Sequence, residues 1–200
     1  MKQVHLFSEW IYRLTALNLL WILFTVAGLG IFGAAPATAA AFRVVYSWQH
    51  EEQIDVSMFR LFLNTFKQRF VSANILFLLI LAGGAFLYSN LYLAFRIDHP
   101  AAFISIGIAI FLTVLYATIV VYSLPLIVHS NIGIFQSMKL ALIYGISFPF
   151  DTISLFLSGF ILFWLAGLTP VIHLFFTASI LTYVIMAIIT KNNKKITVSG

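Results

Sequence analysis

Four long stretches of the chain carry no charged residue, and they define its expected architecture. They are Leu14–Ala41, Val71–Phe95, Pro100–Met138 and Thr152–Thr190. A helix of about 20 apolar residues crosses the hydrocarbon region of a bilayer, and each stretch reaches or exceeds that length. The pattern therefore predicts an all-α integral membrane protein, formed as one multi-pass domain over residues 1–200.

Turn residues divide these stretches into about five transmembrane helices. Gly167 and Pro170 interrupt the last stretch, and a proline is favourable at the first position of a helix. The first span is expected to be retained, although the small residues that follow it loosely resemble a signal-peptide cleavage site. The predicted spans are about Leu14–Phe32, Val71–Phe95, Phe103–Val128, Phe150–Leu168 and Pro170–Thr190.

The polar region between the first two spans predicts two short cytoplasmic amphipathic helices, about Pro36–Gln49 and Val56–Phe70. In the second of these, large apolar residues recur along one narrow stripe of the helix. The stripe fits a helix lying in the membrane interface, and it fits equally well a helix packing on its own transmembrane bundle. Its members are Phe59, Phe62, Leu63, Phe66 and Phe70.

A third short helix is expected before the fourth span, at Ile132–Ser147, with Lys139 in its middle. A lysine at the centre of a bilayer costs about 2.5 to 3.5 kcal/mol on the insertion scale. An interfacial helix is therefore preferred here over a re-entrant one.

The distribution of lysine and arginine predicts the orientation. With five spans, one face of the membrane holds Lys2, Arg13 and Arg96 out of the 11 basic residues, and the opposite face holds the other eight. Cytoplasmic loops are the ones enriched in basic residues, so the N-terminus is predicted outside and the C-terminus inside the cell. The basic residues of the cytoplasmic helices are candidates for docking a partner or lipid: Arg43, Arg60, Lys67, Arg69 and Lys139.

Composition narrows the possible chemistry. Only 8% of the residues are charged, and the net charge of +5 comes with no soluble domain that could present a basic face to nucleic acid. The absence of cysteine excludes disulfides and thiol chemistry. The chain has no phosphate-binding glycine loop, zinc-binding H-E-x-x-H pair or G-x-S-x-G elbow, so no enzyme activity and no cofactor or metal site are expected.

Few polar residues are expected inside the membrane. Asn18, Asn74 and Asn90 are the candidates, and each is expected to hydrogen-bond another helix rather than a substrate. Asp151 is expected at the membrane interface. His129 and His173 fall near span ends on opposite sides, and His50 with Glu51 and Glu52 falls in a polar turn, so none of these is expected to bind a metal. The absence of charged residues from the interiors of the predicted spans argues against a proton- or sodium-coupled carrier.

Several segments resemble the YesL-like family of bacterial membrane proteins, whose function is unknown. They are Asn18–Trp21, Phe24–Gly28, Ile31–Gly33, Pro36–Ala40, Phe62–Asn74, Leu124–His129 and Ser137–Leu142. The resemblance covers nearly the whole chain, and its motifs are structural rather than catalytic. It implies a multi-pass protein of the bacterial cytoplasmic membrane with a role near carbohydrate import.

Two hypotheses follow for the function. The first is a non-enzymatic accessory or scaffold protein that works with an ABC-type sugar importer through its basic face, with membrane lipid as its other partner. The alternative is a passive solute channel or carrier lined by Asn18, Asn74 and Asn90. An intramembrane enzyme ranks last, because the sequence offers no nucleophile. Nothing in the sequence indicates whether copies of the chain associate.

Overall fold

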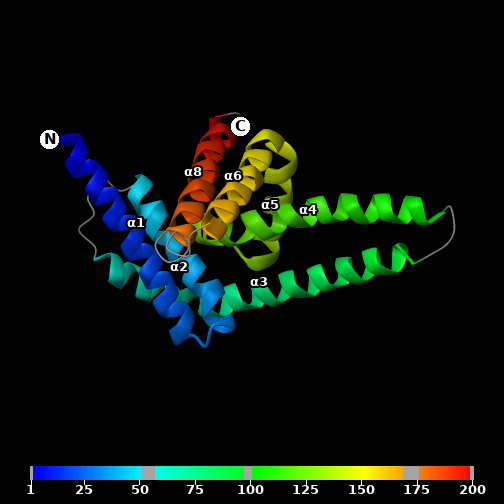
Figure 1. The fold of residues 1–200 in the computed structure, drawn as a ribbon, viewed down its shortest axis with the longest axis horizontal. Coiled ribbons are helices and arrows are strands. Elements are labelled where there is room, and N and C mark those ends of the chain that lie inside the picture. The colour runs from blue at the N-terminus through cyan, green and yellow to red at the C-terminus, as the bar shows by residue number, and fades with distance from the viewer. Residues whose placement is uncertain (1, 51–56, 97–100, 169–175, 199–200) are drawn as a thin grey trace. The chain divides into compact units, whose positions relative to one another are not determined.

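The chain folds into α-helices, as the charge-free stretches predict (Figure 1). A computed structural model describes residues 2–50, 57–96, 101–168 and 176–198, and each regular element in those ranges is a helix. The fold divides into two compact units, of which the first comprises Met1–Ala73 with Phe150–Gly200 and the second Asn74–Pro149. The predicted all-α class is thereby confirmed.

The first unit is built on a tight hairpin of α1 (Lys2–Ala27) and α2 (Ile31–His50). The turn between them uses left-handed backbone at Leu29 and Gly30, with φ of 61° and 73°. Gly28 and Gly33 face each other across the turn, and a Cβ on either one would overlap backbone atoms of the hairpin.

Helix α2 differs from the surface helix expected at Pro36–Gln49. It begins five residues earlier, at Ile31, and Pro36 lies inside it. It packs against α1 and α8 (Thr177–Val198), and Ala37, Ala39 and Ala40 on its packed side are 0% exposed. Small side chains let helix backbones approach closely, so this alanine-rich helix belongs to the core of the first unit.

Helix α3 (Met58–Ala94) joins two elements that were expected to be separate, Val56–Phe70 and Val71–Phe95. The phenylalanine stripe at its start packs on α1, where the Phe24 ring lies 5.1 Å from Phe62 and 5.0 Å from Phe66. Phe62 is 0% exposed. Phe62 and Phe66 thus pack on the chain's own bundle, whereas Phe59 and Phe70 are 50% and 37% exposed, and the interfacial interpretation of the stripe stays a prediction.

Helix α8 runs antiparallel to α1 (Figure 1). The Trp10 ring of α1 lies 5.5 Å from the Tyr183 ring of α8, whereas Asn18, further along α1, contacts Ala178 at the start of α8. The N-terminal part of α1 and the C-terminal part of α8 therefore lie at the same end of the first unit. The expectation of termini on opposite sides of the membrane gains no support from this packing.

The second unit contains the rest of α3, α4 (Ala101–Ser130) and α5 (Ile134–Ser147). Helices α4 and α5 form an antiparallel hairpin in which the rings of Tyr122 and Tyr144, both buried, lie 5.9 Å apart. The Tyr116 hydroxyl of α4 donates a hydrogen bond to the carbonyl oxygen of Ile80 in α3. Lys139 is exposed on α5, and the interfacial placement of this helix stays a prediction.

The described helices indicate a membrane protein with fewer complete crossings than the five expected. The helices at Phe7–Ala27, Met58–Ala94 and Phe103–Ser130 are long and apolar enough to cross, and α5 with α6 (Pro149–Leu168) makes a fourth if the broken pair forms one span. The predicted fifth span begins outside the described residues, at Pro170. Its described part begins at Thr177, level with Asn18 near the middle of α1.

Candidate functional site

The interior of the first unit, where α1, α2 and α8 meet, contains most of the polar contacts between helices that the structure describes. Asn18 is buried there, at 1% exposure. Its Oδ1 accepts hydrogen bonds from the backbone N–H groups of Ala178, at 3.0 Å, and Ser179, at 3.3 Å.

These two bonds give Asn18 a defined role. The first N–H groups of a helix have no partner inside that helix, and a polar side chain just before the helix usually accepts from them. Here the acceptor comes from α1 instead, about 160 residues earlier in the chain. Asn18 thus caps α8 inside the bundle and fixes where that helix begins.

Two further contacts join α2 to its neighbours. Trp21 of α1 donates from Nε1 to the Thr38 hydroxyl at 2.9 Å, and that hydroxyl donates to the carbonyl oxygen of Ala34 at 2.8 Å. The Thr190 hydroxyl of α8 donates to Oε1 of Gln49 at 3.3 Å. Both contacts hold helix against helix, the role that buried polar groups most often have in lipid.

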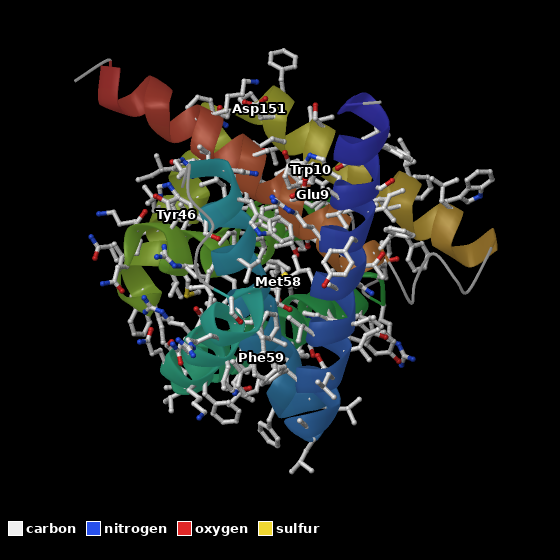
Figure 2. The ribbon with its side chains drawn as sticks, turned by 90° about the vertical axis from the view of Figure 1, so that its left-hand side faces the viewer. Glu9, Trp10, Tyr46, Met58, Phe59 and Asp151 are labelled. Atoms are coloured by element: carbon white, nitrogen blue, oxygen red, sulfur yellow. The ribbon has the colours of Figure 1, made fainter. Side chains whose placement is uncertain are left out.

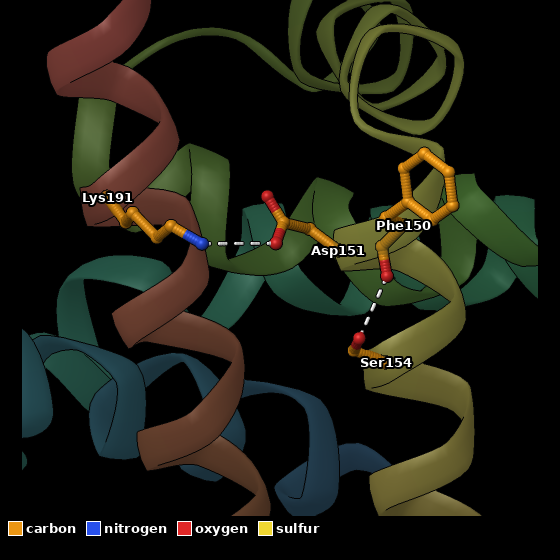
Figure 3. Close-up of polar contacts among 4 residues, drawn as sticks. All are labelled: Phe150, Asp151, Ser154 and Lys191. Carbon is orange, nitrogen blue, oxygen red and sulfur yellow. Dashed lines mark hydrogen bonds and ion pairs between the residues drawn. The ribbon is translucent and has the colours of Figure 1, made fainter.

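An ion pair links the start of α6 to the end of α8 (Figure 3). Lys191 Nζ lies 3.3 Å from Asp151 Oδ1, and the two side chains are 58% and 20% exposed. In the same turn of α6, the Ser154 hydroxyl donates to the carbonyl oxygen of Phe150 at 2.9 Å. Asp151 also lies in the first turn of α6, where a negative charge is favourable. Its expected position at the membrane interface stays a prediction.

Three aromatic rings gather at the same end of the unit. The Trp10 ring meets Trp48 of α2 and Tyr183 of α8 edge to face, at centroid distances of 6.2 Å and 5.5 Å. Beside them is a cavity of about 320 Å³ lined by Trp10, Leu14, Ile180 and Tyr183. Figure 2 shows Glu9 and Trp10 together on α1, toward the opposite end of that helix from Met58 and Phe59.

The other two candidate asparagines belong to the second unit. Asn74 is buried at 9% exposure in α3. Asn90 is exposed, and its Nδ2 donates to the carbonyl oxygen of Phe86 one turn earlier in its own helix, at 2.8 Å. An outward-facing amide that is bonded to its own helix does not line an interior path.

The candidate docking residues fall into three settings. Arg60 and Lys67 are exposed on α3, whereas Arg69 is partly buried there. Arg43 lies on α2, with its guanidinium carbon 5.4 Å from the Tyr46 ring centroid. Lys139 is exposed in the second unit. Arg60 and Lys67 together form a surface that is here named the basic side of α3. Within the described chain, no other helix exposes two of the candidate docking residues.

The histidines show local contacts. Nδ1 of His50 lies 3.1 Å from the carbonyl oxygen of Tyr46, and Nδ1 of His129 lies 3.1 Å from the Ser130 hydroxyl. Glu51, Glu52 and His173 lie outside the described residues. Within the described ranges, no group of 3 or more His, Asp or Glu side chains is placed to hold a metal ion.

The sequence identified Asn18 and Asp151 as polar residues of interest. It did not identify most of the other residues that make contacts between helices in the first unit. Trp10, which lies between Glu9 and Arg13, could have been recognised from the sequence as a candidate interface residue, since tryptophan concentrates at membrane interfaces. Gln49, Thr190 and Tyr183 carry no comparable signal, because their partners are distant in the chain.

Comparison with known proteins places the chain in a family. Residues 14–91 match the family described as "Protein of unknown function, DUF624". The chain is 30% identical to the uncharacterized protein YesL of Bacillus subtilis over 179 residues, which covers 90% of this chain and 84% of YesL. It is 32% identical to the uncharacterized protein YteU of the same organism over 183 residues, covering 92% of this chain and 82% of YteU.

A third relative in that organism, the uncharacterized protein YesV, is 31% identical over 166 residues, covering 81% of this chain and 79% of YesV. No solved structure matches the chain. The similarity covers about four-fifths or more of both proteins in each comparison, and it agrees with the motifs spread along the sequence. The chain therefore belongs to the YesL-like family of membrane proteins of unknown function.

Proposed function

We propose that this chain is a non-enzymatic accessory protein of the bacterial cytoplasmic membrane that binds a subunit of an ABC-type sugar importer. The observation that carries the proposal is that the first four turns of α3 have one packed apolar side and one exposed basic side. Phe62 and Phe66 on one side pack on Phe24 of α1, which leaves Arg60 and Lys67 exposed on the other. Neither Arg60 nor Lys67 has an ion-pair partner among the described residues.

The polar groups of the first unit favour this role over transport. Asn18 caps α8, Thr190 bonds Gln49, and Asp151 pairs with Lys191. Each of these groups is used to hold two helices together. A passive carrier lined by the three asparagines has less support, because Asn90 is exposed and bonded within its own helix.

Charge reversal on the basic side of α3 tests the proposal. In cells that express both proteins, Arg60→Glu with Lys67→Glu should reduce the importer subunit that co-purifies in mild detergent by about tenfold, since repulsion across an interface costs several kcal/mol. The control reverses Arg96 alone, an exposed arginine just beyond the C-terminal end of α3. Unchanged co-purification by the α3 variant, or an equal loss in the control, contradicts the proposal.

The orientation of the chain is a separate expectation. The antiparallel pairing of α1 and α8 favours both termini on one side of the membrane if α1 crosses it, in place of the N-out, C-in orientation expected from five spans. Lys2, Arg13, Lys191, Lys194 and Lys195 lie on the terminal segments of this pair, so we propose that this side is cytoplasmic.

Reporter fusions distinguish the two orientations. A reporter active only in the cytoplasm should be active at both the N- and the C-terminus, and a reporter active only outside should be inactive at both. Opposite results at the two ends would restore the orientation expected from five spans. The docking proposal holds in either case, because Arg60 and Lys67 are exposed on α3 regardless of side.

A further inference from the structure

The cavity between α1 and α8 has the features of a lipid site. It measures about 320 Å³, at the small end of the range for ligand pockets. Its walls are the rings of Trp10 and Tyr183 and the aliphatic chains of Leu14 and Ile180. Leu14 lies one turn from Trp10 on α1, so the lining of the cavity follows this helix for about one turn.

Charges of both signs stand beside this apolar cavity. Arg13 and Glu9, one turn apart on α1, form an ion pair, and the guanidinium carbon of Arg13 lies 6.0 Å from the centroid of the Trp10 ring. The side chains remain accessible, at 29% exposure for Arg13 and 51% for Glu9. An arginine has five N–H donors and a carboxylate can accept several hydrogen bonds, so both groups retain capacity for a ligand.

The position along α1 fits the edge of a bilayer. Glu9, Trp10 and Arg13 lie in the N-terminal part of α1, ahead of the charge-free stretch that begins at Leu14. Tryptophan and tyrosine concentrate at the level of lipid headgroups, with the polar edge of the ring toward water and the rest toward the acyl chains. A ligand here would meet charge at one end and hydrocarbon at the other.

We propose that this site binds one molecule of phosphatidylethanolamine from the membrane. One acyl chain would occupy the cavity, the phosphate would meet Arg13, and the ammonium would meet Glu9. The pairing of opposite charges on the protein complements the pairing in a zwitterionic headgroup. An anionic headgroup without an ammonium would satisfy Arg13 but would bring negative charge toward the Glu9 carboxylate. The inference is independent of the proposed association with an importer.

Native mass spectrometry of the full chain in detergent tests the proposal. Added phosphatidylethanolamine should give a species with one bound lipid at a concentration about tenfold lower than phosphatidylglycerol requires, a difference of about 1.4 kcal/mol. Glu9→Gln should remove this preference. Equal binding of the two lipids by the unmodified chain overturns the assignment of the headgroup site, and this comparison needs no variant.

Substitutions that fill the cavity test the position of the acyl chain. Ile180→Trp and, independently, Leu14→Phe should weaken phosphatidylethanolamine binding by about tenfold, because the added side chain occupies the space of the acyl chain. The matched control is Leu23→Trp on α1, at a side chain 58% exposed and outside the cavity lining. Undiminished binding by cavity variants that retain the thermal midpoint of the unmodified protein shows that the lipid binds elsewhere and overturns the proposal.

Discussion

Alanine at Gly28 or Gly33 should destabilise the protein by roughly 3 kcal/mol, the upper range for forcing extra atoms into a packed interior. A Cβ on Gly33 would overlap the carbonyl oxygen of Thr25, and a Cβ on Gly28 would overlap the Cα of Gly33. The obstructing atoms are backbone, so no side-chain rotation relieves the clash. The α1–α2 hairpin would have to open, and α2 would lose its packing against α1 and α8.

Thermal unfolding in detergent, followed by circular dichroism, measures this effect. Gly107→Ala in α4 is the control, since nothing lies within 4 Å of the position its Cβ would take. In a helix interior, alanine is favoured over glycine by about 1 kcal/mol, so this control should be neutral or stabilising. A Gly33→Ala protein with the thermal midpoint of the unmodified chain would show that the hairpin is looser than described.

Replacing Asn18 by leucine should cost about 2 kcal/mol of folding stability. Leucine has a similar volume but no acceptor, so the N–H groups of Ala178 and Ser179 lose their shared partner inside the bundle. A buried donor left without a partner costs about 1 to 3 kcal/mol, and the middle of that range is expected because two donors lose the one acceptor that they share. The first turn of α8 should unwind before the rest of the unit.

Asn90→Leu is the matched control for this substitution. Its amide is exposed and bonds only its own helix in the described structure, so the change in stability should stay within about 0.5 kcal/mol. Hydrogen–deuterium exchange at residues 177–180 gives the local readout. Faster exchange is expected there in the Asn18 variant, and unchanged protection would contradict the role of Asn18 as a cap.

The sequence was sufficient for the helical class and for several elements. Lipid cannot hydrogen-bond the backbone, so a long charge-free stretch has few options besides a helix. All of the predicted span Val71–Phe95 except its last residue, and the whole of Phe103–Val128, lie within observed helices. The phenylalanine stripe on α3 was also visible in the sequence. Its partner Phe24 was not, because periodicity reveals which face is apolar but not what covers it.

The start of α2 could not be derived from local signals. Pro36 was interpreted as the first residue of a helix, the position that proline favours. In the structure it lies in the second turn of a helix that begins at Ile31. Because Pro36 lies so near the start of α2, the proline removes only a hydrogen bond close to the helix end, and the alanine-rich face gains its packing on α1 and α8.

The candidate site was only partly predictable for a related reason. An asparagine in a charge-free stretch predicts a contact between helices, and Asn18 makes one. The identity of the partner depends on the start of α8, which the tertiary structure sets. The cavity depends on residues as distant as Trp10 and Tyr183, and no spacing in the sequence connects them.

The central claim is that the basic side of α3 contacts a subunit of a sugar importer, and photo-crosslinking in native membranes tests it most directly. A photoreactive amino acid at position 67 should give an adduct that mass spectrometry identifies as an importer subunit. The same amino acid at the exposed position 96 serves as the control and should not yield that adduct. Adducts with lipid alone at position 67, or the same importer adduct from both positions, would contradict the claim.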